Sequence, residues 1–209
     1  MAHGEGESGL MPLKSDHHRF LYIAIPKTGS STMTVYLKAH YGAIEQGRHH
    51  AAEYSVPAGY LCWTVVRNPY RRLLSWWDAW TFGYTGVKYP PKDRPKHTCS
   101  FAEFITFLVD SREGADLPAL IRTIRYPQHL YARQQPCTVL VKLENIQGEF
   151  RSLPFAKPIP FGERRNIGKW RDRGTLPEFY AQAGVAQAVV KYGIAEECEA
   201  LGYPVGMPE

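Results

Sequence analysis

Apolar residues occur along the chain in short runs that are separated by polar, glycine-containing and proline-containing segments. Three of these runs, residues 20–25, 60–66 and 137–143, are typical of buried strands. The first is a β-rich run without charge, long enough for one strand and too short to span a membrane. Each run is followed by a turn and then by a segment of helical character. The pattern therefore predicts three strand-to-helix units.

Helical spacing of apolar residues identifies the first two helices. Residues 33–41 show this spacing after the first strand, and residues 70–82 show it after the second. Pro69 suits the first turn of the second helix, where its missing N–H costs nothing. The apolar flank of that helix is aromatic, and we expect its tryptophans to lie in the core. They are Trp76, Trp77 and Trp80.

Two capping boxes predict the starts of later helices. Ser100 is followed three residues later by Glu103, and Thr175 by Glu178, so each pair can satisfy backbone N–H groups at a helix start. The second box is expected to open a helix that runs towards Tyr192.

The chain has 209 residues, 44% of them hydrophobic, enough for one domain with a substantial core. Residues 1–18 are rich in Gly, Glu, Ser and His, so we expect a disordered tail there and one domain over residues 19–209. Residues 83–100 form a Pro-, Gly- and Lys-rich insertion without periodicity. This insertion is either a contact for an anionic acceptor or a solvated charged loop.

The segment between the first strand and its helix has the composition of an anion-binding loop. Backbone N–H groups at the helix start point into this loop, and the helix dipole adds positive potential. Lys27 supplies a cation, Gly29 lets the backbone approach a ligand closely, and hydroxyl side chains add donors. The loop residues expected at a phosphate or sulfate are Pro26, Lys27, Thr28, Gly29, Ser30, Ser31 and Thr32.

Two other interpretations of this loop stay open. In the P-loop of nucleoside triphosphatases the lysine follows the last glycine, whereas Lys27 precedes Gly29, so the order disfavours that class. The other interpretation is a serine-rich helix cap after an edge strand, without any ligand.

PKTGSST after a strand resembles the phosphosulfate-binding loop of sulfotransferases that use 3′-phosphoadenosine 5′-phosphosulfate (PAPS). A PAPS site needs a second basic element for the 3′-phosphate. VRNPYRRLLS resembles the motif in which these enzymes place an arginine and, eight positions later, a serine on that phosphate, and Arg67 and Ser75 have this separation. An arginine that caps a sheet edge, with a serine on the helix surface, is the alternative.

A third segment after the last strand resembles the C-terminal nucleotide loop of the same enzymes, a basic pair followed by a Gly-x-Trp-basic group. Its matching residues are Arg164, Arg165, Gly168, Lys169 and Trp170. The three segments cover most of residues 20–170, and their arrangement is most similar to the carbohydrate sulfotransferases of the Golgi, including the heparan sulfate 2-O-sulfotransferase type. A solvated basic loop is the alternative for the third segment.

The resemblance implies an α/β fold with a central, mainly parallel sheet flanked by helices, a P-loop-like sulfotransferase fold. It also implies in-line transfer of the sulfuryl group from PAPS to an acceptor hydroxyl, with Lys27 stabilising the leaving oxygen. In the 2-O-sulfotransferase type, a histidine on the loop before the second strand is the proposed general base. His50 lies at the corresponding place and is our first choice, followed by His49 and Glu53.

The resemblance makes a glycan hydroxyl the first choice of acceptor, followed by a small-molecule hydroxyl or a protein tyrosine. Neither the chemistry nor any ligand cluster calls for a metal, and we expect no nucleic acid partner. Four scattered cysteines and the lack of a signal peptide or anchor indicate a cytoplasmic protein, or a Golgi one if the chain is trimmed from an anchored enzyme.

The net charge of +5 favours anionic ligands without choosing among them. Two other functions therefore stay open. One is a nucleotide-dependent small-molecule kinase, although the Walker order and a metal-binding carboxylate at a strand end are not visible. The other is a non-catalytic module that binds polyanions.

Overall fold

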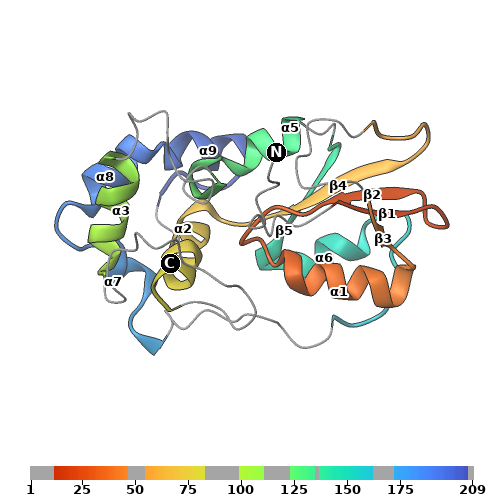
Figure 1. Ribbon diagram of the computed structural model, residues 1–209, viewed down its shortest axis with the longest axis horizontal. Helices are drawn as coiled ribbons and strands as arrows, with labels where there is room; N and C mark the ends of the chain where they lie inside the picture. The colour runs from red at the N-terminus through yellow and green to blue at the C-terminus, as the bar shows by residue number, and fades with distance from the viewer. Residues whose placement is uncertain are drawn as a thin grey trace, which may run out of the picture. The chain divides into compact units, whose positions relative to one another are not determined.

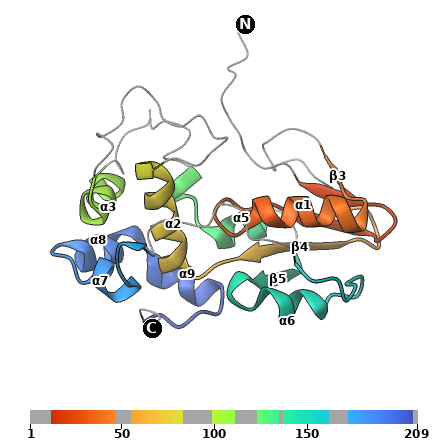
Figure 2. The ribbon, with the colours of Figure 1, turned by 90° about the horizontal axis from the view of Figure 1, so that it is seen from below.

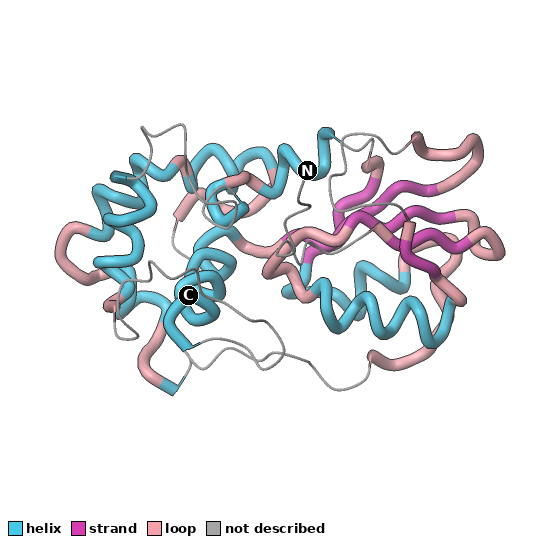
Figure 3. The backbone as a smooth tube through the Cα atoms, viewed as in Figure 1, coloured by secondary structure: helices cyan, strands magenta, loops and turns pink. Residues whose placement is uncertain are grey.

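The computed structural model describes residues 12–46, 55–82, 99–110, 123–134, 137–161 and 172–206. The chain divides into two compact units, whereas its length suggested one domain. The first, which we call the sheet unit, comprises Met1–Arg67 and Gln128–Asn166. The second, the helical unit, comprises Asn68–Pro127 and Ile167–Glu209. All strands among the described residues belong to the sheet unit (Figure 3).

The sheet has five strands in the order β3-β1-β2-β4-β5 (Figure 1). Their bounds are β1 Leu13–Ser15, β2 Phe20–Ile23, β3 Ile44–Glu45, β4 Leu61–Val66 and β5 Val139–Lys142. Strands β2, β4 and β5 pair in parallel, whereas β1 pairs antiparallel with both β2 and β3. Four strands therefore run in one direction, which confirms the α/β fold with a mainly parallel, helix-flanked sheet.

Strand β1 corrects the expectation of a disordered tail over residues 1–18. Leu13 is fully buried and pairs with Tyr22 of β2, and the Ser15 hydroxyl donates a 2.7 Å hydrogen bond to the Tyr41 carbonyl. Polar composition suggested a tail, but the strand is stabilised by pairing with distant residues. Residues 1–11 of that segment lie outside the described residues.

Helices α1 (Ser30–Tyr41) and α6 (Ile146–Arg151) lie on the same side of the sheet (Figures 1 and 2). They pack there on alternate strand residues, as the two-residue period of a strand requires. The buried aromatic side chains of this core are Phe20, Tyr22, Tyr36, Tyr41, Trp63 and Phe150. The buried cluster on the opposite face is smaller and includes Leu21, Ile23 and Cys62. The sheet unit also contains α5 (Gln128–Gln134) and the 3-10 helix η3 (Leu143–Asn145).

The described part of the helical unit contains α2 (Pro69–Phe82), α3 (Phe101–Asp110), α7 (Leu176–Tyr180), α8 (Val185–Tyr192) and α9 (Ile194–Ala200). Trp76, Trp77 and Trp80 are buried in its core, as predicted. Both capping boxes are present. The helix expected to run on to Tyr192 is instead two helices, because Gly184 adopts a left-handed φ of 79° before α8. No helix in the described ranges is both long and apolar enough to cross a membrane.

Candidate active site

The loop after β2 has an unusual backbone. Lys27 has a φ of 70°, in the left-handed region that non-glycine residues seldom adopt, and Gly29 follows with a φ of 81°. Gly29 is the N-cap of α1 and has no side chain to cap the first turn, while its carbonyl accepts a 3.0 Å bond from the Met33 N–H. This geometry directs the helix start towards the loop, as anion binding requires.

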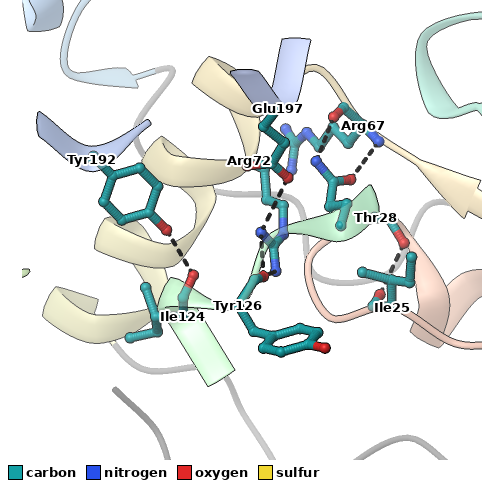
Figure 4. A network of polar contacts seen from close by, with 9 residues as sticks. Ile25, Thr28, Arg67, Arg72, Ile124, Tyr126, Tyr192 and Glu197 are labelled. Carbon is teal, nitrogen blue, oxygen red and sulfur yellow. Dashed lines mark hydrogen bonds and ion pairs between the residues drawn. The ribbon is translucent and has the colours of Figure 1, made fainter. Parts of the chain in front are cut away.

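Thr28 stabilises the loop from within. Its side chain is fully buried, and its hydroxyl donates a 2.8 Å hydrogen bond to the carbonyl of Ile25 (Figure 4). Ser30 is buried at the start of α1, whereas Ser31 and Thr32 are half-buried. Because the Thr28 hydroxyl donates within the loop, an anion would meet its backbone N–H rather than this hydroxyl proton.

Leu143 lies against the loop from the turn after β5. It follows β5 as the first residue of η3, and a Cβ added at Gly29 would lie only 2.8 Å from its Cδ1 atom. The loop after β2 and the turn after β5 therefore approach each other closely. Glycine at position 29 suits this backbone conformation, and a side chain there would require Leu143 to move.

Arg67 is the first residue after β4, and its guanidinium extends to the loop after β2. Its Nη1 atom donates a 3.3 Å hydrogen bond to the carbonyl of Lys27. Its backbone is held by the Gln128 side chain: the Arg67 N–H donates to Oε1 at 2.8 Å, and Nε2 donates to the Arg67 carbonyl at 2.9 Å (Figure 4). Gln128 is fully buried. The residues Lys27, Gly29 and Arg67 are thus gathered at one place.

That place is the carboxyl edge of the parallel strands. In the register, Ile23 at the end of β2 pairs with Thr64, and Val66 at the end of β4 pairs with Lys142 at the end of β5. The segments after all three strands consequently emerge along the same edge. Ligands of open α/β sheets bind at this edge.

Ser75 belongs to the helical unit, where it is buried on α2. The same helix carries Arg72, whose Nη1 atom lies 3.6 Å from the Glu197 carboxylate in a buried ion pair (Figure 4). Arg72 also donates two hydrogen bonds, of 3.2 and 3.3 Å, to the carbonyl of Tyr126. These contacts hold α2 within its own unit. The joint role predicted for Arg67 and Ser75 on one phosphate stays a prediction.

Other predicted site residues fall outside the described residues. They are His49, His50 and Glu53 of the connector, and Arg164, Arg165, Gly168, Lys169 and Trp170 of the third segment. Conversely, Gln128 and Leu143 were not among the predicted site residues. Their contacts join segments far apart in the chain, and no local pattern indicates them.

The fold and the site define an α/β protein with a glycine-containing loop at the start of a helix and an arginine at the carboxyl edge of its sheet. A model of the Sulfotransferase family matches residues 13–146, more than half of the chain. The chain belongs to this family, whose members are transferases of the sulfuryl group. No curated protein and no solved structure matches it.

Proposed function

We propose that this protein transfers the sulfuryl group of PAPS to an acceptor hydroxyl, with a carbohydrate as the first choice of acceptor. One observation supports the choice of donor above others. The loop that suits a phosphosulfate and the arginine that suits a 3′-phosphate are joined by the bond from Arg67 to the Lys27 carbonyl. A donor with anionic groups at both ends of its nucleotide matches this arrangement.

The reaction is an in-line displacement. The acceptor oxygen forms a bond to sulfur while the bond from sulfur to the bridging oxygen breaks, leaving 3′-phosphoadenosine 5′-phosphate. Charge spreads over the sulfuryl oxygens, as in phosphoryl transfer, so positioning and fixed hydrogen-bond donors supply most of the rate. Lys27 neutralises the bridging oxygen as it leaves. Backbone N–H groups from Thr28 to Thr32 hold the phosphosulfate.

The acceptor proton passes to a base during attack, since a neutral hydroxyl is a weak nucleophile. We assign this role to His50, with His49 second and Glu53 third. Arg67 and Ser75 bind the 3′-phosphate. The third segment, with Arg164, Arg165, Gly168, Lys169 and Trp170, completes the nucleotide site. The acceptor is selected by residues 83–100, and no step requires a metal.

Calorimetric titration with 3′-phosphoadenosine 5′-phosphate tests the proposal, with ATP and adenosine 5′-phosphosulfate as controls. Selective binding of 3′-phosphoadenosine 5′-phosphate is expected, because it is the only one of the three ligands with a 3′-phosphate. Binding that ignores the 3′-phosphate would overturn the choice of donor. A kinase would prefer ATP, and a polyanion module would bind all three ligands with a steep dependence on salt.

A further inference from the structure

We propose that Gln128 is a positioning residue for recognition of the 3′-phosphate, acting through Arg67. This inference rests on the proposed function, in which Arg67 binds that phosphate. The starting observation is the pair of hydrogen bonds between one buried side-chain amide and both backbone groups of Arg67, at 2.8 and 2.9 Å. Gln128 comes from another part of the chain, as the first residue of α5.

The position of Arg67 in the sheet explains why such a residue is needed. The pairing of β4 with β2 ends at Thr64, and its pairing with β5 ends at Val66. Arg67 is therefore the first residue beyond both ladders, where no strand partner fixes its backbone. A glutamine side chain has the same donor and acceptor as a peptide group. Gln128 therefore makes with the Arg67 backbone the two hydrogen bonds that a neighbouring strand would make.

Fixing this backbone also sets the direction of the guanidinium. The N–H and the carbonyl of Arg67 are both hydrogen-bonded, so the backbone from which its side chain extends is fixed. The guanidinium at the end of that side chain donates a 3.3 Å hydrogen bond to the Lys27 carbonyl. Arg67 has a long side chain with many rotamers, whose ordering costs conformational entropy on ligand binding. Gln128 lowers this cost by ordering the base of the side chain before the nucleotide arrives.

The test compares 3′-phosphoadenosine 5′-phosphate with adenosine 5′-phosphate, two probes that differ only in the 3′-phosphate. Gln128→Met keeps the approximate size of the side chain and removes both hydrogen bonds. We expect it to weaken binding of the first nucleotide on the order of tenfold, because the guanidinium is then less well placed on the 3′-phosphate, and to leave binding of the second unchanged. Gln182→Met is the matched control, because the Gln182 amide accepts a 3.3 Å bond from the Ala102 N–H in the helical unit.

A double-mutant cycle separates positioning from general support of the fold. In an Arg67→Ala background, Gln128→Met should cause no further loss of binding, since the group through which it acts is gone. Equal losses for both nucleotides, or losses that add to those of Arg67→Ala, would overturn the inference. If Gln128→Met does not fold, Gln128→Asn keeps an uncharged amide but shortens the side chain by one methylene, which moves the amide away from Arg67 and allows the same comparison.

The two proposals fail differently. A wild-type protein that does not distinguish the two nucleotides overturns the proposed donor, and this inference with it. A selective wild-type protein whose selectivity survives Gln128→Met overturns the role of Gln128 alone.

A separate observation supports a second inference, at the opposite end of the strands. The Sγ atoms of Cys62, near the start of β4, and Cys137, which precedes β5, lie 3.3 Å apart. The carbonyl of Cys62 accepts a 2.9 Å bond from the Thr138 N–H, so the two segments are already held together. We infer that this dithiol is a modification site, which a low-molecular-weight disulfide such as oxidised glutathione converts into a cross-link.

The exchange has two steps. The Cys137 thiol, half-buried and therefore the more accessible, loses its proton to solvent and attacks one sulfur of oxidised glutathione, releasing one glutathione thiolate. Cys62 then loses its proton, attacks the Cys137 sulfur and releases the second glutathione as a thiolate, and the two glutathione thiolates take up the two protons. Two protein thiols are oxidised and one glutathione disulfide is reduced. The hydrogen bond with Cys62 raises the pKa of the Cys137 thiol, so the first step should be faster as pH rises.

Mass spectrometry after treatment with oxidised glutathione tests the inference. We expect the loss of two hydrogen atoms and a peptide that joins Cys62 to Cys137, both abolished by Cys137→Ser. Cys99→Ser is the control and should retain the cross-link, since Cys99 is a free half-buried thiol elsewhere in the chain. If Cys62 and Cys137 both remain open to alkylation after oxidation and denaturation, the inference is wrong.

Discussion

The guanidinium of Arg67 donates a hydrogen bond to the backbone carbonyl of Lys27, with 3.3 Å between the nitrogen and oxygen atoms. This bond joins the residue after β4 to the loop after β2. The two segments are separate motifs in the sequence. The carbonyl belongs to a residue in the left-handed conformation, with a φ of 70°. In the proposed enzyme, this bond places the guanidinium that binds the 3′-phosphate beside the loop that holds the phosphosulfate.

We predict that Lys27→Ala and Arg67→Ala affect different kinetic steps. Lys27→Ala should lower turnover on the order of 10²- to 10³-fold, because it removes a fixed charge at the leaving oxygen. Arg67→Ala should mainly weaken nucleotide binding. Steady-state kinetics and calorimetry separate the two effects. Lys38→Ala is the control, since Lys38 is an exposed residue of α1 that pairs with Glu45, and equal effects of the two site variants on binding alone would contradict the assigned roles.

Gly29→Ala should destabilise the protein and weaken nucleotide binding. A left-handed φ of 81° costs an alanine about 1–2 kcal/mol, and the added Cβ would lie 2.8 Å from Leu143 Cδ1. Gly42→Ala is a matched control, since Gly42 also has a positive φ, of 57°, but nothing within 4 Å of its added Cβ.

Denaturant unfolding of both variants measures the difference. Gly29→Ala should lose on the order of 1 kcal/mol more than Gly42→Ala because of the crowding at Leu143. Adding Leu143→Ala to Gly29→Ala should relieve this crowding and restore part of the nucleotide affinity. Identical losses in the two alanine variants, with unchanged binding in both, would show that the Leu143 contact has no influence on the loop.

The base assignment predicts that His50→Ala lowers turnover by about 10²- to 10⁴-fold and removes the acidic limb of the pH–rate profile. The reason is that a neutral imidazole must accept the acceptor proton during attack. His49→Ala is measured in parallel as the second candidate, and His40→Ala, at an exposed position of α1, serves as the control. The histidine hypothesis fails if His50→Ala and His49→Ala each leave turnover near that of the wild type.

The two capping boxes predict a contribution to stability that depends on pH. The backbone N–H of Ser100 donates a 2.6 Å hydrogen bond to Glu103, and this bond lowers the pKa of the carboxyl group. The Thr175 N–H has the same effect on Glu178, also at 2.6 Å. Because both pKa values are lower in the folded state, the stabilisation is complete above the unfolded value of about 4.3 and is lost as pH falls through the folded values.

Replacing both residues by glutamine keeps the hydrogen-bonded boxes but removes their titration. We therefore expect the double variant to lose less unfolding free energy than the wild type between neutral pH and a pH below about 4. Denaturant unfolding at the two pH values measures this difference. An acid-induced loss equal to that of the wild type would contradict the prediction.

Local features of the fold could be predicted well from the sequence. Some elements depend only on residues that are neighbours along the chain, so the sequence predicts them without the fold. They are the strand, loop and helix of residues 20–41 and the two capping boxes. The same is true of the loop containing Lys27 and of Arg67 after its strand. These local motifs indicated the sulfotransferase family, and the family model that matches residues 13–146 confirms it.

Contacts between distant segments could not be predicted in this way. Leu13 becomes part of a strand because β2 and β3 pair with it, whereas the polar composition of residues 1–18 suggested a tail. The glutamine that holds Arg67 is 61 residues away from it and resembles any other polar residue beside a proline. Leu143 limits position 29 only through the alignment of β2, β4 and β5.

The sequence by itself therefore determined the chemistry available to this protein: a cation, small residues and hydroxyl groups at a helix start, and an arginine after a strand. Only the tertiary structure decided that Arg67 contacts Lys27, that Gln128 fixes the Arg67 backbone, and that Cys62 meets Cys137. The physical reason is that parallel strands align the ends of segments that are far apart in the chain. Side chains of no local significance then meet at the edges of the sheet.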